Sequence, residues 1–118
     1  MRLHHVQLAI PAGAEDLCRA FYCDVLGWPE LPKPPALAAR GGLWLKADED
    51  ELHLGVEQDF RPARKAHPAF AVRDLDAVAE KLRAAGAAVD FDEAIAGLRR
   101  FYTMDPVGNR IEFLEDKA

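Results

Sequence analysis

The stretch HVQLAI, residues 5–10, alternates polar and apolar side chains and precedes a predicted helix. A similar order returns at HPAFAV, residues 67–72, which also begins with histidine and precedes a second predicted helix. Side chains of a β-strand point alternately to the two faces of a sheet, so both stretches predict a strand with one apolar face. The chain therefore contains a degenerate internal repeat, in which each half begins with a strand and a helix.

The two predicted helices end at glycines. The first is expected from about Ala14 to Leu26 and stops at Gly27, and the second begins at the N-cap Asp74 and stops at Gly86. The apolar faces are expected to consist of Leu17, Phe21, Val25 and Leu26 in the first helix, and of Leu75, Val78, Leu82 and Ala85 in the second.

Further strands complete each half as an antiparallel meander. In the first half they are LWLKA (43–47) and ELHLGVE (51–57), and in the second AAVDFDE (87–93), RRFYTM (99–104) and NRIEFLE (109–115). The turn DPVGN (105–109) favours a hairpin, because proline presets φ and glycine accepts a positive φ. The proline-rich residues 28–42 are expected to form a loop with at most one irregular strand. The order of elements predicts an α+β fold.

The composition of the chain limits the classes of function that it can have. A chain of 118 residues with a net charge of −5 is one domain by size and lacks the basic surface that binds nucleic acid. Two short basic clusters remain, Arg61 with Arg64 and Lys65, and Arg99 with Arg100, and either could hold a small anionic ligand.

The cysteines and the apolar segments give an expectation about location. Cys18 and Cys23 lie on one predicted helix, and neither belongs to a zinc-binding pair. The chain shows neither a signal peptide nor a stretch long enough to span a membrane. We therefore expect a cytoplasmic protein with no membrane partner.

Strand parity sets four polar residues apart from the apolar faces. His5, His53, His67 and Glu112 each lie on the face opposite the large apolar residues of their strand. In the register of the repeat, His5 and His67 are 62 residues apart, and His53 and Glu112 are 59 residues apart. Solvated sheet faces carry such residues routinely, but matching positions in two repeats favour a metal site of imidazole and carboxylate. His4 has the opposite parity to His5 and is expected to pack at the edge of the core.

Three stretches resemble the vicinal oxygen chelate superfamily, which includes glyoxalase I, extradiol dioxygenases, fosfomycin-resistance enzymes, methylmalonyl-CoA epimerase and bleomycin-resistance proteins. They are LHHVQLAI (3–10), AFYCDVLGW (20–28) and RRFYTMDPVGNRIEFLE (99–115). The resemblance implies one domain over residues 1–118, with two tandem βαβββ modules, residues 1–60 and 64–118. Their curled mixed sheets surround an open cleft, with the helices outside. It also implies a homodimer whose cleft is shared between chains.

The resemblance assigns metal positions residue by residue. His5, His67 and Glu112 fall on the metal-binding positions of the superfamily, and His53 falls where glyoxalase I has a glutamate and the epimerase a glutamine. Two arrangements stay open: a site of three histidines and Glu112, or a triad without His53 that leaves coordination positions free on Fe(II). In the second arrangement His53 acts as an acid, a base or a structural residue. The divalent metal could be Zn, Ni, Fe, Mn or Co.

The function that the resemblance implies is glyoxalase-like lyase or isomerase chemistry on a small oxygenated or thiol-conjugated metabolite. A metal would polarise vicinal oxygens of the substrate, and Glu112 would move a proton. The alternatives are a metal-free binding protein of the bleomycin-resistance type and an Fe(II) dioxygenase. Trp44 is expected across a hairpin from His53, and Tyr102 across from Glu112, where both would contact the substrate. Arg100, and more weakly Arg40, are candidates to bind an anionic group of the substrate.

Overall fold

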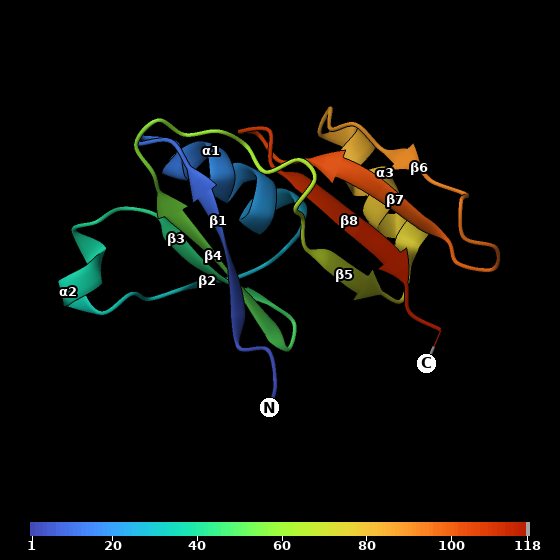
Figure 1. Cartoon of the computed structure of the whole chain (residues 1–118), viewed down its shortest axis with the longest axis horizontal. Coiled ribbons are helices and arrows are strands. Elements are labelled where there is room, and N and C mark those ends of the chain that lie inside the picture. The colour runs from blue at the N-terminus through green and yellow to red at the C-terminus, as the bar shows by residue number, and fades with distance from the viewer. Residues whose placement is uncertain (118) are drawn as a thin grey trace.

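The computed structural model describes residues 1–117, which fold into two halves with the same order of elements (Figure 1). The first half consists of β1 (His5–Ile10), α1 (Glu15–Arg19), the π-helical η1 (Ala20–Val25), β2 (Glu30–Leu31), α2 (Pro35–Ala38), β3 (Leu43–Ala47) and β4 (Asp50–Val56). The second half consists of β5 (Ala69–Val72), α3 (Leu75–Ala84), β6 (Asp90–Phe91), β7 (Arg100–Met104) and β8 (Arg110–Glu115).

Each half forms a four-stranded mixed sheet. The strand orders are β1-β4-β3-β2 and β5-β8-β7-β6, and in both sheets the first pair is parallel while the other pairs are antiparallel. The two sheets lie next to each other along the long axis of the molecule, with α1 behind the first and α3 behind the second (Figure 1). This topology confirms the predicted α+β fold of repeated units.

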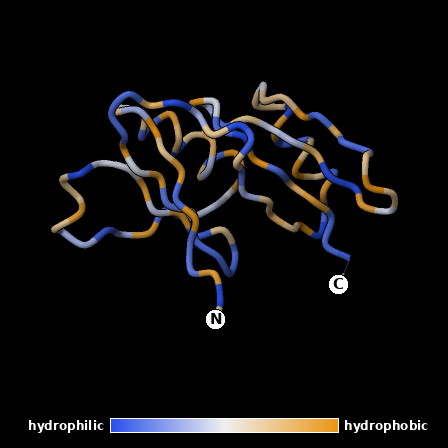
Figure 2. The backbone as a smooth tube through the Cα atoms, in the orientation of Figure 1, coloured by the Kyte–Doolittle hydropathy of each residue, from blue (hydrophilic) through white to orange (hydrophobic). Residues whose placement is uncertain are grey.

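Alternation along the strands places the large apolar residues between sheets and helices. The fully buried side chains include Ile10, Leu52, Leu54, Ile111 and Phe113, which all have the predicted parity. Figure 2 shows hydrophobic residues recurring along the strands, whereas the C-terminal end is hydrophilic. Because both sheets bury one face in a common core, their other faces are left to carry polar residues.

The first helix differs from the prediction. Leu17, expected on its apolar face, is 53% exposed, whereas Cys18, Phe21 and Tyr22 are buried. These three residues follow the i, i+3, i+4 spacing of one helix face, and Leu17 lies about 100° away from Cys18 around the axis. The π-helical turn from Ala20 onward then carries the chain to Gly27, which has the predicted positive φ of 78°.

Three other residues are more exposed than their predicted positions imply. Ala85 is exposed because α3 ends one residue before it, and Ala79 takes the buried position on that helix. Val56, which has the same parity as the buried Leu52 and Leu54, is 36% exposed at the end of β4. His4, expected to pack, is exposed because it precedes the first paired residue of β1.

Several predictions of local structure are confirmed. The Asp74 carboxylate accepts a hydrogen bond from the backbone N–H of Ala77 at 3.0 Å and caps α3, and Gly86 follows that helix with a φ of 82°. The proline-rich segment contains the irregular strand β2, but it also contains α2, whose Pro35 occupies the favourable first position of a helix.

A buried polar network joins the two halves. Asp105 accepts hydrogen bonds from the hydroxyl of Tyr22 at 2.7 Å and from the backbone N–H of Asn109 at 2.8 Å. The Asn109 amide donates to the carbonyl of Ala9 and accepts from the N–H of Ala63, both at 2.8 Å. The DPVGN turn therefore fixes β7 and β8 against η1 and β1, besides reversing the chain.

The two cysteines lie on α1 and η1. Cys18 is buried, Cys23 is half-buried, and both are free thiols. Within residues 1–117, no helix has the length and apolar character needed to cross a membrane.

Candidate metal and substrate site

The four predicted metal ligands occupy equivalent positions in the two sheets. His53 pairs with Gln7 in the parallel register of β1 and β4, and Glu112 pairs with Ala69 in the parallel register of β5 and β8. His5 and His67 each lie two residues before that register position, but His5 is the first residue of β1, whereas His67 precedes β5, which begins at Ala69 and not at His67 as predicted. The structure therefore forms two half-sites of the same design, His5 with His53 and His67 with Glu112.

The first half-site is a stack of three rings. Trp44 lies opposite His53 in the register of β3 and β4, and their ring centroids are 4.5 Å apart. The ring of His5 covers the other side of His53, with centroids 4.0 Å apart and planes 11° from parallel. This stack leaves His53 only 5% exposed, so the face that was predicted to be solvated is partly closed.

Hydrogen bonds orient the two imidazoles of this half-site. His53 Nε2 contacts Oε1 of Glu51 at 3.0 Å, and this hydrogen bond lowers the pKa of Glu51. Nδ1 of His5 contacts Nδ1 of His4 at 2.9 Å. Desolvation, followed by repulsion from His53 and His4, lowers the pKa of His5 below its ordinary value of 6.5. The neutral, metal-binding form of His5 is therefore favoured, and its Nε2 has no hydrogen-bond partner within residues 1–117.

The second half-site is a histidine–carboxylate pair. Nε2 of His67 lies 2.9 Å from Oε1 of Glu112, and Nδ1 of His67 lies 2.8 Å from the carbonyl oxygen of Lys65. A carbonyl only accepts hydrogen bonds, so Nδ1 donates to Lys65, and Nε2, which faces the Glu112 carboxylate in this structure, is the nitrogen left to turn toward a metal. Metal-binding histidines usually have this arrangement, with the second nitrogen donating to a carbonyl or carboxylate.

Arg100 and Tyr102 lie beside Glu112 but differ from expectation in their contacts. Tyr102 is opposite Glu112 in the register of β7 and β8, as predicted. Arg100 donates to Oε2 of Glu112 at 3.3 Å and to the hydroxyl of Tyr102 at 2.9 Å, and it also pairs with Asp92 at 3.3 Å. Its guanidinium is therefore occupied by this chain's own acids, which suits Arg100 to orient Glu112.

A cavity of about 510 Å³ opens over the first half-site. Besides Trp44 and the histidines, it is lined by Gln7, Lys33, Leu37 and Arg40. The side chain of Arg40 makes no ion pair or hydrogen bond within residues 1–117, so it is free to meet a ligand. Parity with His5 pointed to Gln7, but nothing in the sequence indicated that α2 brings Lys33 and Leu37 to this cavity.

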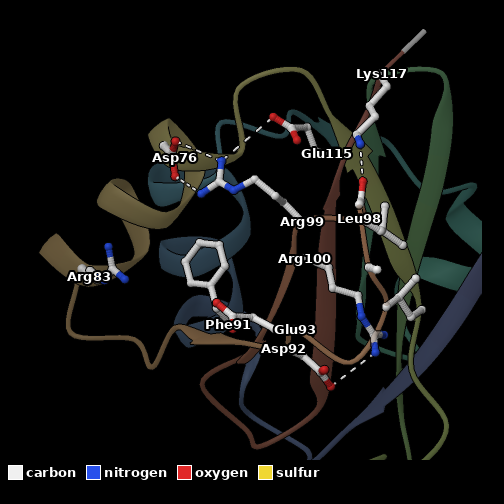
Figure 3. A pocket seen from close by; sticks show the side chains of 13 residues that line it. Asp76, Arg83, Phe91, Asp92, Glu93, Leu98, Arg99, Arg100, Glu115 and Lys117 are labelled. Carbon is white, nitrogen blue, oxygen red and sulfur yellow. Dashed lines mark hydrogen bonds and ion pairs between the residues drawn. The ribbon is translucent and has the colours of Figure 1, made fainter.

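A second hollow of about 860 Å³ lies between α3, β6, the following loop and β7 (Figure 3). Several of its cations already have partners: Arg99 reaches Asp76 at 2.8 Å, Arg100 reaches Asp92, and Lys117 donates to the carbonyl of Gly97. It contains no histidine, and its charges largely neutralise one another. Despite its size, this hollow is a weaker candidate than the cavity over the histidines.

The four predicted ligands are of the types that bind a divalent metal, but they do not come together within one chain. Imidazole and carboxylate are the usual ligands of Zn, Ni, Fe, Mn and Co. Within residues 1–117, however, no three His, Cys, Asp or Glu side chains come close enough together to hold a metal ion. Each half-site therefore presents two candidate donors, fewer than a metal ion needs.

Comparison with known proteins identifies the family. The family model of the glyoxalase-like domain matches residues 7–114. This chain belongs to the glyoxalase-like family. Among solved structures, a Bacillus anthracis protein assigned to the glyoxalase family is 48% identical, with a TM-score of 0.95, and the match covers 99% of this chain and 96% of that one. No curated protein matched the sequence.

More distant structures share the fold of this glyoxalase-like chain. Lactoylglutathione lyase from Agrobacterium tumefaciens is 23% identical with a TM-score of 0.76, covering 98% of this chain and 94% of that one. TnmS3, an antibiotic binding protein from Streptomyces sp. CB03234, is 21% identical with a TM-score of 0.73, covering 99% and 97%. The predicted superfamily is confirmed, and its members include both enzymes and binding proteins.

Proposed function

We propose that this glyoxalase-like chain is a metal-dependent enzyme whose metal is held between two copies of the chain. One observation supports the proposal: the two half-sites have the same register design, and each presents two candidate donors while no single chain brings three together within residues 1–117. In a two-fold dimer, His5 and His53 of one chain would meet His67 and Glu112 of the other, and the same contact would form twice. The two modules, residues 1–60 and 64–118, would then contribute one half-site each.

Each residue of the proposed site would have a separate role in the reaction. A divalent metal bound there would supply Lewis-acid polarisation of neighbouring oxygens of a small oxygenated or thiol-conjugated metabolite. Glu112 takes a proton from the substrate on Oε1, the atom that lies 2.9 Å from Nε2 of His67. Arg100 fixes the orientation of that carboxylate through Oε2, and Trp44 forms a wall of the substrate cavity. The reaction class is lyase or isomerase chemistry.

One observation favours a second arrangement of the same site. Nε2 of His53 is engaged by Glu51, and the ring is enclosed between Trp44 and His5. Without His53, the ligands would be two histidines and one carboxylate, the set typical of Fe(II) oxygenases. A metal-free binding protein of the bleomycin-resistance type would need neither arrangement.

Metal analysis of the purified protein tests the proposal. Wild type is expected to bind about one divalent ion per chain, whereas His5→Ala and Glu112→Ala bind almost none, since each loses a donor. Glu93→Ala is the control, because Glu93 is an exposed acid that lines the other hollow and belongs to neither half-site. If wild type binds no ion more tightly than these variants do, the enzyme proposal is wrong and the binding-protein alternative replaces it.

Mixing the two defective variants tests whether the site is shared. In a mixed dimer of His5→Ala and Glu112→Ala chains, one site carries both defects and the other carries none. Random exchange of chains should therefore restore about one quarter of the wild-type metal per chain. No recovery in a mixture that light scattering shows to be dimeric would rule out a shared site, and a stable wild-type monomer would do the same.

A further inference from the structure

A small basic hollow of about 350 Å³ lies beside the second half-site. We define this basic hollow by the residues Arg64, Lys65, Asp90, Tyr102, Met104 and Arg110. Three of them are cations and one is an acid, in a chain whose net charge is −5. The hollow therefore concentrates positive charge next to the carboxylate of Glu112, which neither the fold nor the proposed metal site explains.

Arg110 is held in place but not neutralised. Its guanidinium carbon lies 3.8 Å from the centroid of the Tyr102 ring, and the one side-chain hydrogen bond that it makes within residues 1–117, to the carbonyl of Arg64, is long at 3.5 Å. The ring of Tyr102 is itself fixed by the hydrogen bond from Arg100 to its hydroxyl and by the edge contact with His67. Stacking on an aromatic ring leaves the edge of a guanidinium free to donate to a planar or tetrahedral anion.

The other two cations are also fixed by the backbone and have no acidic partner. The N–H of Arg110 donates to the carbonyl of Ala63 at 2.8 Å, and the carbonyl of Lys65 accepts from His67. The side chains of Arg64 and Lys65 make no ion pair or hydrogen bond within residues 1–117. By contrast, both arginines of the other basic cluster, Arg99 and Arg100, are paired with acids.

The basic hollow lies next to the residues to which the proposed reaction is assigned. Arg110 and Glu112 are two residues apart on β8 and therefore lie on the same face of the sheet. His67, whose Nε2 contacts Glu112, is held by the carbonyl of Lys65, the residue that also lines the hollow. A ligand bound to these cations would reach directly toward the second half-site.

We infer that the basic hollow binds the carboxylate or phosphate group of an anionic substrate and positions the rest of that substrate toward Glu112. The inference rests on the proposed function and adds the substrate class to it. Arg110 supplies a forked pair of donors, while Arg64 and Lys65 supply charge. The volume accommodates a single acidic group with a short chain, at the lower end of small-molecule sites.

Anion binding to metal-free protein tests the inference. The chain of residues 1–118 is treated with a chelator, dialysed, and titrated calorimetrically with inorganic phosphate and, separately, with malonate. Arg110→Ala is expected to weaken binding of the preferred anion by about tenfold or more, because a charge-assisted hydrogen bond is lost. Arg64→Ala is the second variant, in case Arg110→Ala does not fold. Arg73→Ala, an exposed arginine outside the hollow, should bind within about twofold of wild type.

The two anions and a metal-site variant separate the outcomes. Tighter binding of phosphate identifies a phosphorylated substrate, and tighter binding of malonate identifies a carboxylate. Equal affinity of wild type, Arg110→Ala and Arg64→Ala, or no binding of either anion, overturns the inference. His5→Ala should bind the anion as wild type does. Failure of the metal site would instead appear as loss of metal binding in wild type with anion binding intact.

Discussion

Trp44 and His53 face each other across β3 and β4, with their ring planes 12° from parallel. His5 continues the stack on the other side of His53, so an indole on one strand is coupled to two potential metal ligands on the neighbouring strands. The cross-strand register, which the sequence predicted, determines which rings meet. The closeness of the stack makes Trp44 a natural reporter of the site.

Fluorescence should report metal binding through Trp44. The chain has two tryptophans, so Trp28→Phe leaves only the emission of Trp44. Adding Ni²⁺ to this variant is expected to quench its emission in proportion to the metal bound. In Trp44→Phe the remaining Trp28, which packs on Tyr22 and Phe70, should keep its emission. Equal quenching of both variants would mean that Ni²⁺ binds away from the ring stack.

Removing His53 distinguishes the two ligand sets. If His53 is a ligand, His53→Ala should weaken metal binding by more than about 100-fold, beyond the effect typical of residues that only orient ligands. Competition with a chromogenic chelator measures the affinity, with Glu93→Ala, an exposed residue outside both half-sites, as the control. Unchanged affinity in His53→Ala would support the triad of His5, His67 and Glu112.

The buried hydroxyl of Tyr22 should stabilise the junction of the two halves. Tyr22→Phe removes the 2.7 Å hydrogen bond to the Asp105 carboxylate and is expected to lower the free energy of unfolding by about 1.5–3 kcal/mol. Tyr102→Phe removes a hydrogen bond at a half-buried position and should cost about 1 kcal/mol or less. Urea unfolding measures both. Equal losses would show that the burial of the Asp105 network contributes nothing extra.

Gly42 should tolerate no side chain. It has a φ of 84°, and a Cβ built on it would lie 2.1 Å from the carbonyl oxygen of Leu54, which is backbone and cannot move aside cheaply. Gly86 has a similar φ of 82° but open space around it, so Gly86→Ala measures the backbone strain alone, about 1–2 kcal/mol. Gly42→Ala should cost about 1–3 kcal/mol more, because of the clash. Thermal unfolding that gave equal losses would contradict this steric argument.

The thiol of Cys18 should be inert in the folded protein. Burial raises its pKa to about 12, so about one thiol in ten thousand is ionised at pH 8. In Cys23→Ser, an aromatic disulfide reagent should therefore react only after unfolding in urea, whereas in Cys18→Ser the half-buried Cys23 should react slowly without urea. Because the unfolded thiol ionises near 9.0, stability should fall as the pH rises from about 9 toward 12. Rapid reaction of folded Cys23→Ser would contradict this burial.

The sequence was sufficient for the repeated fold and for the strand faces. Apolar residues occupy every second position of β1, β4 and β8, and each strand can bury them only by turning that face toward the core. Parity alone therefore placed His5, His53 and Glu112 on the opposite face. The helix faces were less certain. A π-helical turn changes the angular spacing of residues, and no periodicity of the sequence showed that Leu17 would be exposed and Cys18 buried.

What the tertiary structure decided is which polar groups meet. Parity selects a face but not a distance, so only the packed sheets show that His67 pairs with Glu112 while His5 stacks on His53. Similarly, Arg100 and Arg110 are both arginines on strands of the second sheet, yet Arg100 is paired with Glu112, whereas Arg110 stacks on Tyr102 with no acidic partner within residues 1–117. Such contacts depend on the relative placement of segments far apart in the chain. Local sequence patterns set the direction of each side chain and leave that placement undetermined.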